Sequence, residues 1–170
     1  MIRKGICWVA APGTGGSKPL DVNDLDFQQA KKRGDFKEGW LGIPKIGMKD
    51  SSVMDACTQV LAERNPNLVV SHLFPGIVAT DAAANQGFSW PFVQASKLAK
   101  MVGISSSPSP GGYPEVPFFL HANPEGASYL RKGEANLFSP GLSRYSISSN
   151  VSDPKVREQV YKNMAAYFNK

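Results

Sequence analysis

The sequence predicts an α/β protein in which a small, mainly parallel sheet lies between flanking helices, making three layers. Short apolar runs at 6–9 and 68–74 are typical of buried strands. Amphipathic patterns typical of helices occupy 48–64, between these two runs, and 154 to the C-terminus. A helix that connects two buried strands is the usual route to parallel pairing. With 170 residues, 42% of them hydrophobic, the chain suits one domain with its own core.

The first strand is expected at 5–11, which contains the apolar run at 6–9. The loop at 12–16 is rich in glycine. It lacks the spacing of a dinucleotide-binding turn and the Lys-Ser/Thr ending of a P-loop, so no phosphate cradle is expected there. The stretch at 17–44 is polar and irregular, and one short helix is expected within 21–33.

The helix at 48–64 has the clearest pattern in the chain. Val53 and Val60 recur on one face, and Pro66 prevents the helix from continuing. The apolar run at 68–74 follows at once. A short, nearly continuous apolar run directly after a helix predicts an inner strand of a parallel sheet.

Further elements are expected in the second half. Helices are predicted at 90–103 and 113–122, a short strand at 136–138, and a final helix from Pro154, where a proline favours the first helical position. Two or three strands make a small sheet with an exposed edge. We expect another copy, a partner or a rearranged loop to cover that edge.

Composition argues against several classes of partner. The formal net charge is +5, but the basic residues are scattered and are not interleaved with aromatics, so nucleic acid is not an expected partner. No apolar stretch approaches the roughly 20 residues that span a bilayer. Cys7 and Cys57 fall in apolar patterns without metal-ligand spacing, which is typical of free thiols. Without a recognisable secretory signal, a cytoplasmic location is expected and no metal site is predicted.

Residues 61–80 resemble a segment of the short-chain dehydrogenase/reductase family, in which a helix, a strand and a Pro-Gly-x-Val-x-Thr loop follow one another. The match is closest to fungal carbonyl-reductase-like or retinol-dehydrogenase-like members. The resemblance implies an incomplete Rossmann-like fold, with 1–170 as a single truncated domain that lacks the N-terminal dinucleotide-binding half. In the family this loop contacts the nicotinamide end of the cofactor, and Pro75, Gly76 and Val78 match it here.

The chain also departs from the pattern of this family. The family's catalytic serine ends the strand that matches 5–11, where this chain has Ala10 and Ala11. The family's catalytic tyrosine and lysine fall on Lys45 and Lys49. The proton donor for hydride transfer would then be missing. We therefore expect no cofactor, with NADP as the alternative.

Four polar residues are the candidate catalytic groups: Lys45, Lys49, His72 and Thr80. Lys45 and Lys49 would share a helical face, where mutual repulsion lowers the pKa of at least one of them. They are either acid/base or Schiff-base lysines, or two solvated lysines. His72 is either a general acid or base, or a core histidine with its hydrogen bonds satisfied. Thr80 either caps a helix or binds ligand.

Aromatic residues from segments that border the family's substrate cleft indicate a hydrophobic pocket for a small molecule. Ordinary core packing is the alternative interpretation. The candidate substrate-binding residues are Trp40, Phe74, Asp81, Phe88, Trp90 and Tyr113.

Three functions are compatible with these observations. The first is a redox-inert, cofactor-independent enzyme that binds a hydrophobic small molecule and catalyses a cyclisation, isomerisation, dehydration or rearrangement. The second is an NAD(P)H-dependent oxidoreductase of the carbonyl-reductase type, or a fragment of one. The third is a non-catalytic, dimeric binding protein. The resemblance also implies a homodimer formed through the helix at 48–64.

Overall fold

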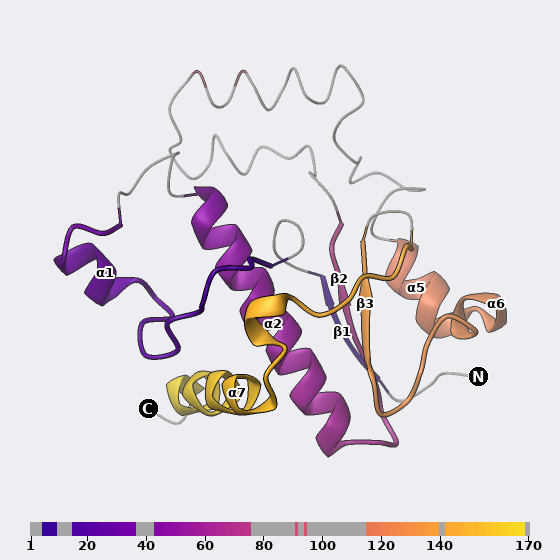
Figure 1. Cartoon of the computed structure of the whole chain (residues 1–170). Coiled ribbons are helices and arrows are strands. Elements are labelled where there is room, and N and C mark those ends of the chain that lie inside the picture. The colour runs from indigo at the N-terminus through magenta and orange to yellow at the C-terminus, as the bar shows by residue number, and fades with distance from the viewer. Residues whose placement is uncertain are drawn as a thin grey trace.

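The computed structural model describes residues 5–9, 15–36, 43–75, 91, 94, 115–139 and 142–168. Its strands are β1 (Gly5–Val9), β2 (Val69–Leu73) and β3 (Ala135–Phe138) (Figure 1). Its helices are α1 (Gln28–Lys32), α2 (Ile43–Arg64), α5 (Glu115–Ala122), α6 (Pro124–Ala127) and α7 (Pro154–Phe168), and a short 3₁₀ helix η1 spans Ser149–Val151.

The three strands form one parallel sheet in the order β1-β2-β3 (Figure 1). Gly5 lies opposite Val69, and Val70 lies opposite Ala135. α2 connects β1 to β2 along the chain and packs against both β2 and β3. This arrangement confirms the predicted α/β class with a reduced parallel sheet and flanking helices.

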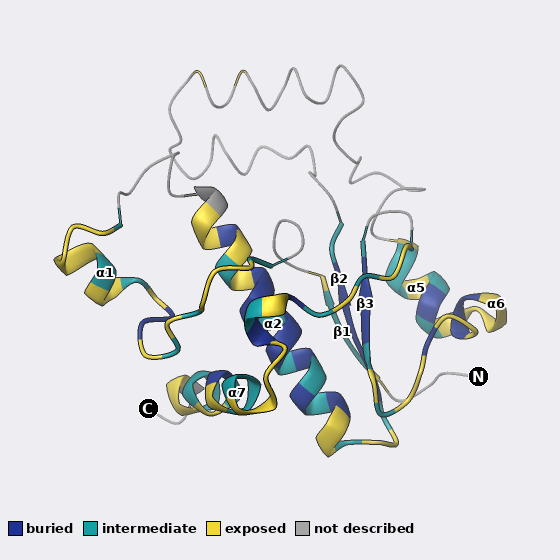
Figure 2. Cartoon of the chain, in the orientation of Figure 1, coloured by how far each residue is buried: buried dark blue, intermediate teal, exposed yellow. Residues whose placement is uncertain are grey.

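β2 is the central strand, and all of its residues are buried (Figure 2). Its side chains alternate between the two faces of the sheet. Leu73 packs with Leu120 of α5 and Phe138 of β3 on one face. His72 contacts Asp55 of α2 on the other face. Burial on both faces explains the nearly continuous apolar run, so the prediction of an inner strand is confirmed.

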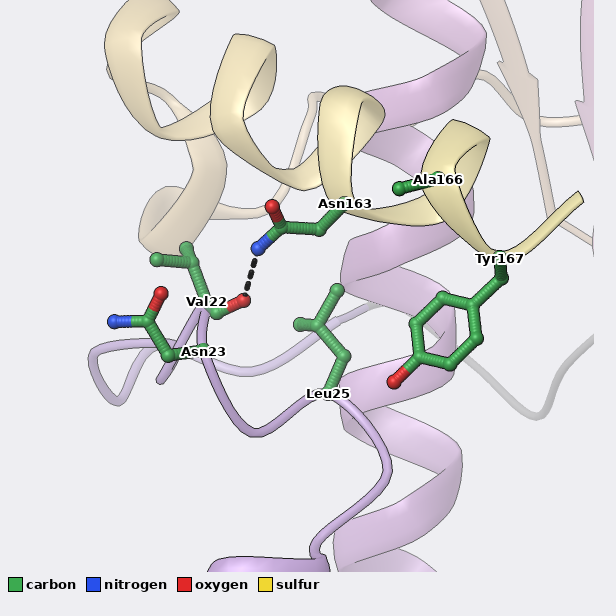
Figure 3. Close-up of a pocket in the computed structure, with 6 residues that line it drawn as sticks. All are labelled: Val22, Asn23, Leu25, Asn163, Ala166 and Tyr167. Atoms are coloured by element: carbon green, nitrogen blue, oxygen red, sulfur yellow. Dashed lines mark hydrogen bonds between the residues drawn. The ribbon is translucent and has the colours of Figure 1, made fainter. Parts of the chain in front are cut away.

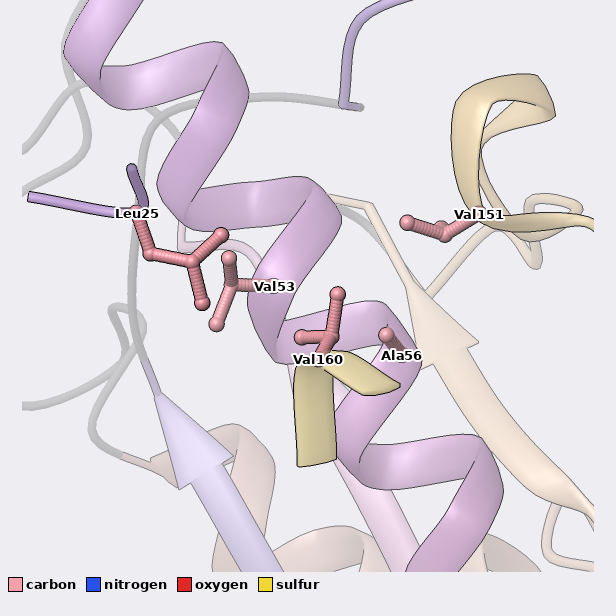
Figure 4. Packing of buried hydrophobic residues seen from close by; sticks show 5 residues of the cluster. All are labelled: Leu25, Val53, Ala56, Val151 and Val160. Atoms are coloured by element: carbon pink, nitrogen blue, oxygen red, sulfur yellow. The ribbon is translucent and has the colours of Figure 1, made fainter. Parts of the chain in front are cut away.

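α2 carries a second apolar cluster, formed with α7, η1 and the loop before α1 (Figure 4). The helix predicted at 48–64 ends at Arg64 as expected but begins earlier, at Ile43. Pro44 stands at the second position of the helix. A proline is tolerated there because the N–H groups of the first turn have no intrahelical acceptor. The members of the cluster are Leu25, Val53, Ala56, Val151 and Val160.

The second half of the described chain agrees with the predicted order of elements. The helix expected at 113–122 is α5, the strand expected at 136–138 is β3, and the last helix begins at Pro154. The short helix α6 was not predicted. Gly126 makes it possible, because a Cβ there would lie 2.0 Å from the carbonyl oxygen of Phe119 in α5. Of the helix predicted at 90–103, only Pro91 and Gln94 are among the described residues.

The sheet leaves two outer strands, β1 and β3. An isolated antiparallel bridge between Phe138 and Arg144 protects part of the β3 edge. Ala10 and Ala11, predicted to end the first strand, lie outside the described residues. No helix in the described part of the chain is long and apolar enough to cross a membrane.

Candidate functional site

A cavity of about 460 Å³ lies beside α1 and the first turns of α2. Its volume falls within the roughly 300–1,000 Å³ of typical small-molecule sites. The wall combines aromatic rings and methionine with basic and acidic side chains. Its lining includes Lys18, Asp21, Asp24, Phe27, Arg33, Asp35, Phe36, Lys45, Met48 and Lys49.

Lys45 and Lys49 both line this cavity from α2. Their placement on one helical face follows from their spacing of four residues, as predicted. Lys45 is exposed, whereas the Lys49 side chain is 10% exposed. Helix periodicity therefore brings two of the four candidate catalytic residues to a single cavity.

Lys49 has a defined environment. Its ammonium group donates a hydrogen bond to the carbonyl oxygen of Leu25, lies 3.7 Å from Asp50 Oδ1, and stands 4.0 Å from the centroid of the Phe27 ring. Burial lowers the pKa of Lys49, while the negative charges of Asp50, Asp26 and Asp24 act in the opposite direction. Repulsion by Lys45 was the predicted cause of a lowered pKa. That prediction of the cause was wrong, because burial produces the shift.

Phe27 contributes an aromatic wall. Its backbone has φ 58° and ψ 17°, in the left-handed region that bulky residues rarely adopt. The ring stacks on Phe36 with a centroid separation of 4.6 Å and an interplanar angle of 6°. Neither phenylalanine was predicted as a site residue. Their stack depends on a turn between residues nine positions apart, which no periodic pattern reveals.

The acidic residues of the cavity are engaged in internal hydrogen bonds. Asp24 accepts the N–H groups of Gln29 at 2.8 Å and Ala30 at 2.7 Å. Burial alone would raise the pKa of Asp24, but these two hydrogen bonds together with the charges of Arg33 and Lys49 lower it. The Asp24 carboxylate is thus committed to holding the start of α1.

Two further acids of the cavity are also engaged. Asp35 Oδ2 lies 2.8 Å from Nε of Arg33 in an ion pair. Asp21 Oδ1 accepts the N–H of Asn23 at 3.1 Å. Among the described residues, Lys18 and Lys45 have no ion-pair or hydrogen-bond partner. Lys18 and Lys45 are therefore the unpaired cations that a ligand meets in the described part of the cavity.

His72 lies in a different, fully buried environment. Its Nδ1 is 2.9 Å from Asp55 Oδ1, which also accepts the Tyr145 hydroxyl at 3.0 Å. Asp55 Oδ2 accepts the Ser148 hydroxyl at 2.9 Å. Burial, followed by the charge of Asp55, raises the pKa of Tyr145, so its hydroxyl stays protonated. This geometry matches a core histidine with satisfied hydrogen bonds, and His72 does not line the 460 Å³ cavity.

Ser71 and His121 form a second polar contact, on the opposite face of the sheet from His72. Ser71 Oγ lies 3.1 Å from His121 Nε2 of α5. Burial lowers the pKa of His121. Burial also raises the pKa of Cys7, against a smaller opposing effect of its hydrogen bond with Ser71. Cys7 is therefore a protonated thiol at neutral pH rather than a nucleophile.

Of the other predicted site residues, the structure describes Phe74 and Pro75. Phe74 and Pro75 are half-buried at the end of β2, where the Phe74 N–H donates to the Phe138 carbonyl at 2.8 Å. Neither residue lines the cavity. The remaining candidates lie outside the described residues: Trp40, Gly76, Val78, Thr80, Asp81, Phe88, Trp90 and Tyr113.

A smaller hollow of about 220 Å³ lies between the loop before α1 and the end of α7 (Figure 3). Asn163 Nδ2 donates to the Val22 carbonyl at 2.6 Å across it, and Leu25 and Tyr167 form its other walls. It has about half the volume of the cavity beside Lys49 and no basic group. Within the described residues, no cluster of three or more His, Cys, Asp or Glu side chains is placed to hold a metal ion.

Comparison with protein-family models, curated proteins and solved structures found no match for this chain. The resemblance of residues 61–80 to short-chain dehydrogenases therefore stays a prediction from the sequence.

Proposed function

We propose that this chain is a redox-inert, cofactor-independent enzyme that binds a hydrophobic small molecule in the cavity beside α1 and α2. The observation that carries the proposal is the position of Lys49, 10% exposed and facing the same cavity as Phe27 and Phe36. The reaction class is an isomerisation, dehydration, cyclisation or rearrangement of a carbonyl compound. Such reactions require positioning and proton transfer but no net oxidation.

Lys49 is the proposed reactive group. Burial lowers its pKa, which increases the fraction of free amine near neutrality. A free amine acts as a base or attacks a carbonyl carbon, in which case water leaves as a Schiff base forms. The hydrogen bond to Leu25 and the ring of Phe27 fix the position of the Nζ atom. Lys45, one turn away, is placed to attract a negative group on the substrate.

The test is chemical labelling of the intact protein at neutral pH. Salicylaldehyde is added with cyanoborohydride, which traps Schiff bases as stable amines, and the labelled lysines are identified by peptide mass spectrometry. We expect Lys49 to be labelled several-fold faster than Lys155, an exposed lysine at the start of α7. In denaturing urea the two rates should become equal. Labelling of Lys155 at the same rate as Lys49 in the folded protein would contradict the proposal.

A fluorescence titration with NADPH tests the redox-inert part separately. We expect no binding in the micromolar range. Micromolar binding would overturn the redox-inert function and favour the NAD(P)H-dependent oxidoreductase.

The proposed setting is the cytoplasm, and the proposed partner is a second copy of the chain. Free cysteines, with the pKa of Cys57 raised to about 11 by burial, suit a reducing compartment. At the first turn of α2, Ile46 is 38% exposed, which supports this end of the helix as the dimer surface, whereas residues 51–62 of α2 are already buried or half-buried within the chain. Sedimentation should give a dimer that Ile46→Lys converts to monomer. A monomeric wild-type protein at micromolar concentration would contradict this proposal.

A further inference from the structure

The ring of Phe27 stands at the wall of the cavity on a backbone that favours glycine. A left-handed conformation at a bulky residue is strained and persists only when surrounding structure holds it. Here the N–H of Phe27 donates to the Asp24 carbonyl at 3.1 Å, and its own carbonyl accepts the Lys31 N–H at 2.9 Å. The Lys49 ammonium fixes the preceding turn through the Leu25 carbonyl. Three contacts thus hold a strained phenylalanine where a glycine would fit without strain.

The strained position puts an aromatic surface at the cavity. Phe27 and Phe36 both line it and stack nearly parallel. Aromatic rings in such stacks attract further planar rings through offset stacking. The adjoining Met48 also lines the cavity, and a thioether packs favourably on aromatic rings. This wall suits a flat aromatic group better than a flexible aliphatic chain.

Charge limits the ligand further. Asp21, Asp24 and Asp35 are already engaged within the protein. Among the described residues that line the cavity, Lys18 and Lys45 are the cations without an ion-pair or hydrogen-bond partner. A ligand that combines a planar ring with a negative group would stack on the aromatic wall and pair with these lysines. Charged hydrogen bonds to ammonium groups are stronger than neutral ones.

We infer that the cavity binds a planar aromatic carboxylate, and that Phe27 determines this specificity. The inference rests on the cavity of the proposed function and names the class of its ligand. It does not require Lys49 to react. The carboxylate lies toward Lys45 and Lys18, and the ring packs against Phe27 and Phe36.

Three probes of similar size test the inference by isothermal titration calorimetry on the full chain. The probes are 2-naphthoate, the uncharged 2-naphthalenemethanol, and the non-planar decahydro-2-naphthoate. We expect 2-naphthoate to bind about tenfold more tightly than either control, because each control loses one of the two interactions. Equal affinities for the three probes, or no binding of 2-naphthoate, would overturn the inference. This comparison uses the wild-type protein and does not depend on a variant that folds.

Variants assign the two interactions to residues. Phe27→Gly removes the ring and relieves the backbone strain, whereas Phe27→Ala removes the ring and keeps the strain. Both should weaken 2-naphthoate binding by about tenfold, and Phe27→Gly should melt at a higher temperature than Phe27→Ala. Lys45→Gln should weaken binding of 2-naphthoate but not of the alcohol, and the matched Lys155→Gln should change neither. Unchanged 2-naphthoate affinity in Phe27→Gly would remove Phe27 from the site.

The two proposals fail separately. Preferential 2-naphthoate binding without selective labelling of Lys49 would keep the ligand class and remove the reactive lysine. Selective labelling of Lys49 with no preference among the three probes would keep the reactive lysine and overturn the ligand class.

Discussion

Replacing Asp55 with alanine should destabilise the protein by about 3 kcal/mol or more, because two buried polar groups and the half-buried Tyr145 hydroxyl share this one carboxylate. His72 Nδ1, the Tyr145 hydroxyl and the Ser148 hydroxyl all lie within 3.0 Å of its two oxygens. A buried donor without an acceptor costs about 1–3 kcal/mol. Since small domains have a total stability of only about 5–15 kcal/mol, a large loss is expected in urea unfolding monitored by circular dichroism.

Two variants give this prediction its controls. Asp55→Asn keeps one carbonyl acceptor of the same shape and should lose about 1 kcal/mol. Lys45→Ala removes an exposed charged side chain from the same helix, and should change stability by less than about 0.5 kcal/mol. If Asp55→Ala unfolded within about 1 kcal/mol of the wild type, the buried network would contribute little to the fold.

The network around Asp55 also explains a limit of sequence interpretation. Asp55 sits on the buried side of α2 beside Ala56, where a helical pattern predicts an apolar residue. Its partners are far away along the chain, with His72 at a separation of 17 residues and Tyr145 at 90. The pattern shows that a polar residue occupies a core position, but it contains no information about which distant groups satisfy it.

The start of α2 shows the same limit at short range. The helix was predicted to begin at Met48, where Asp50 or Ser51 is a residue type that commonly caps a helix start. In the structure Ser52 is buried, and its hydroxyl donates to the Met48 carbonyl at 2.9 Å and accepts the Gly16 N–H at 3.2 Å. A polar side chain satisfied in this way is buried without disturbing the helix. Polar residues are therefore a poor marker of a helix end.

The candidate site divides along similar lines. Lys45 and Lys49 could be placed on one face because helix geometry is local and periodic. The aromatic wall could not be predicted, because the Phe27 ring stacks on Phe36 through a left-handed turn at Phe27. Phenylalanine rarely adopts that conformation, so the sequence gives no sign of it. Strand β2 and the α/β order were predictable, because burial of a parallel strand on two faces imposes an apolar run that is visible in one short segment.

Phe138 should be the apolar side chain whose loss costs the most in the layer between the sheet and α5. It is fully buried in β3, packs with Leu73 and Leu120, and has the guanidinium of Arg144 at 5.1 Å from its ring. Phe138→Ala should reduce the free energy of unfolding by about 3–5 kcal/mol, since it removes buried area and leaves a cavity between rigid strands. Urea unfolding followed by circular dichroism measures the loss.

Phe118 supplies the matched control, because it is the same residue type on the neighbouring helix α5 but is 74% exposed. Phe118→Ala should change the free energy of unfolding by less than about 0.5 kcal/mol. Both variants delete the same ring from the unfolded chain, so effects on the unfolded state largely cancel. The difference between their losses in free energy of unfolding then measures the contribution of burial at β3. Equal losses in the two variants would mean that β3 and α5 do not pack as a core layer. The sheet would then owe its stability to α2 on its other side.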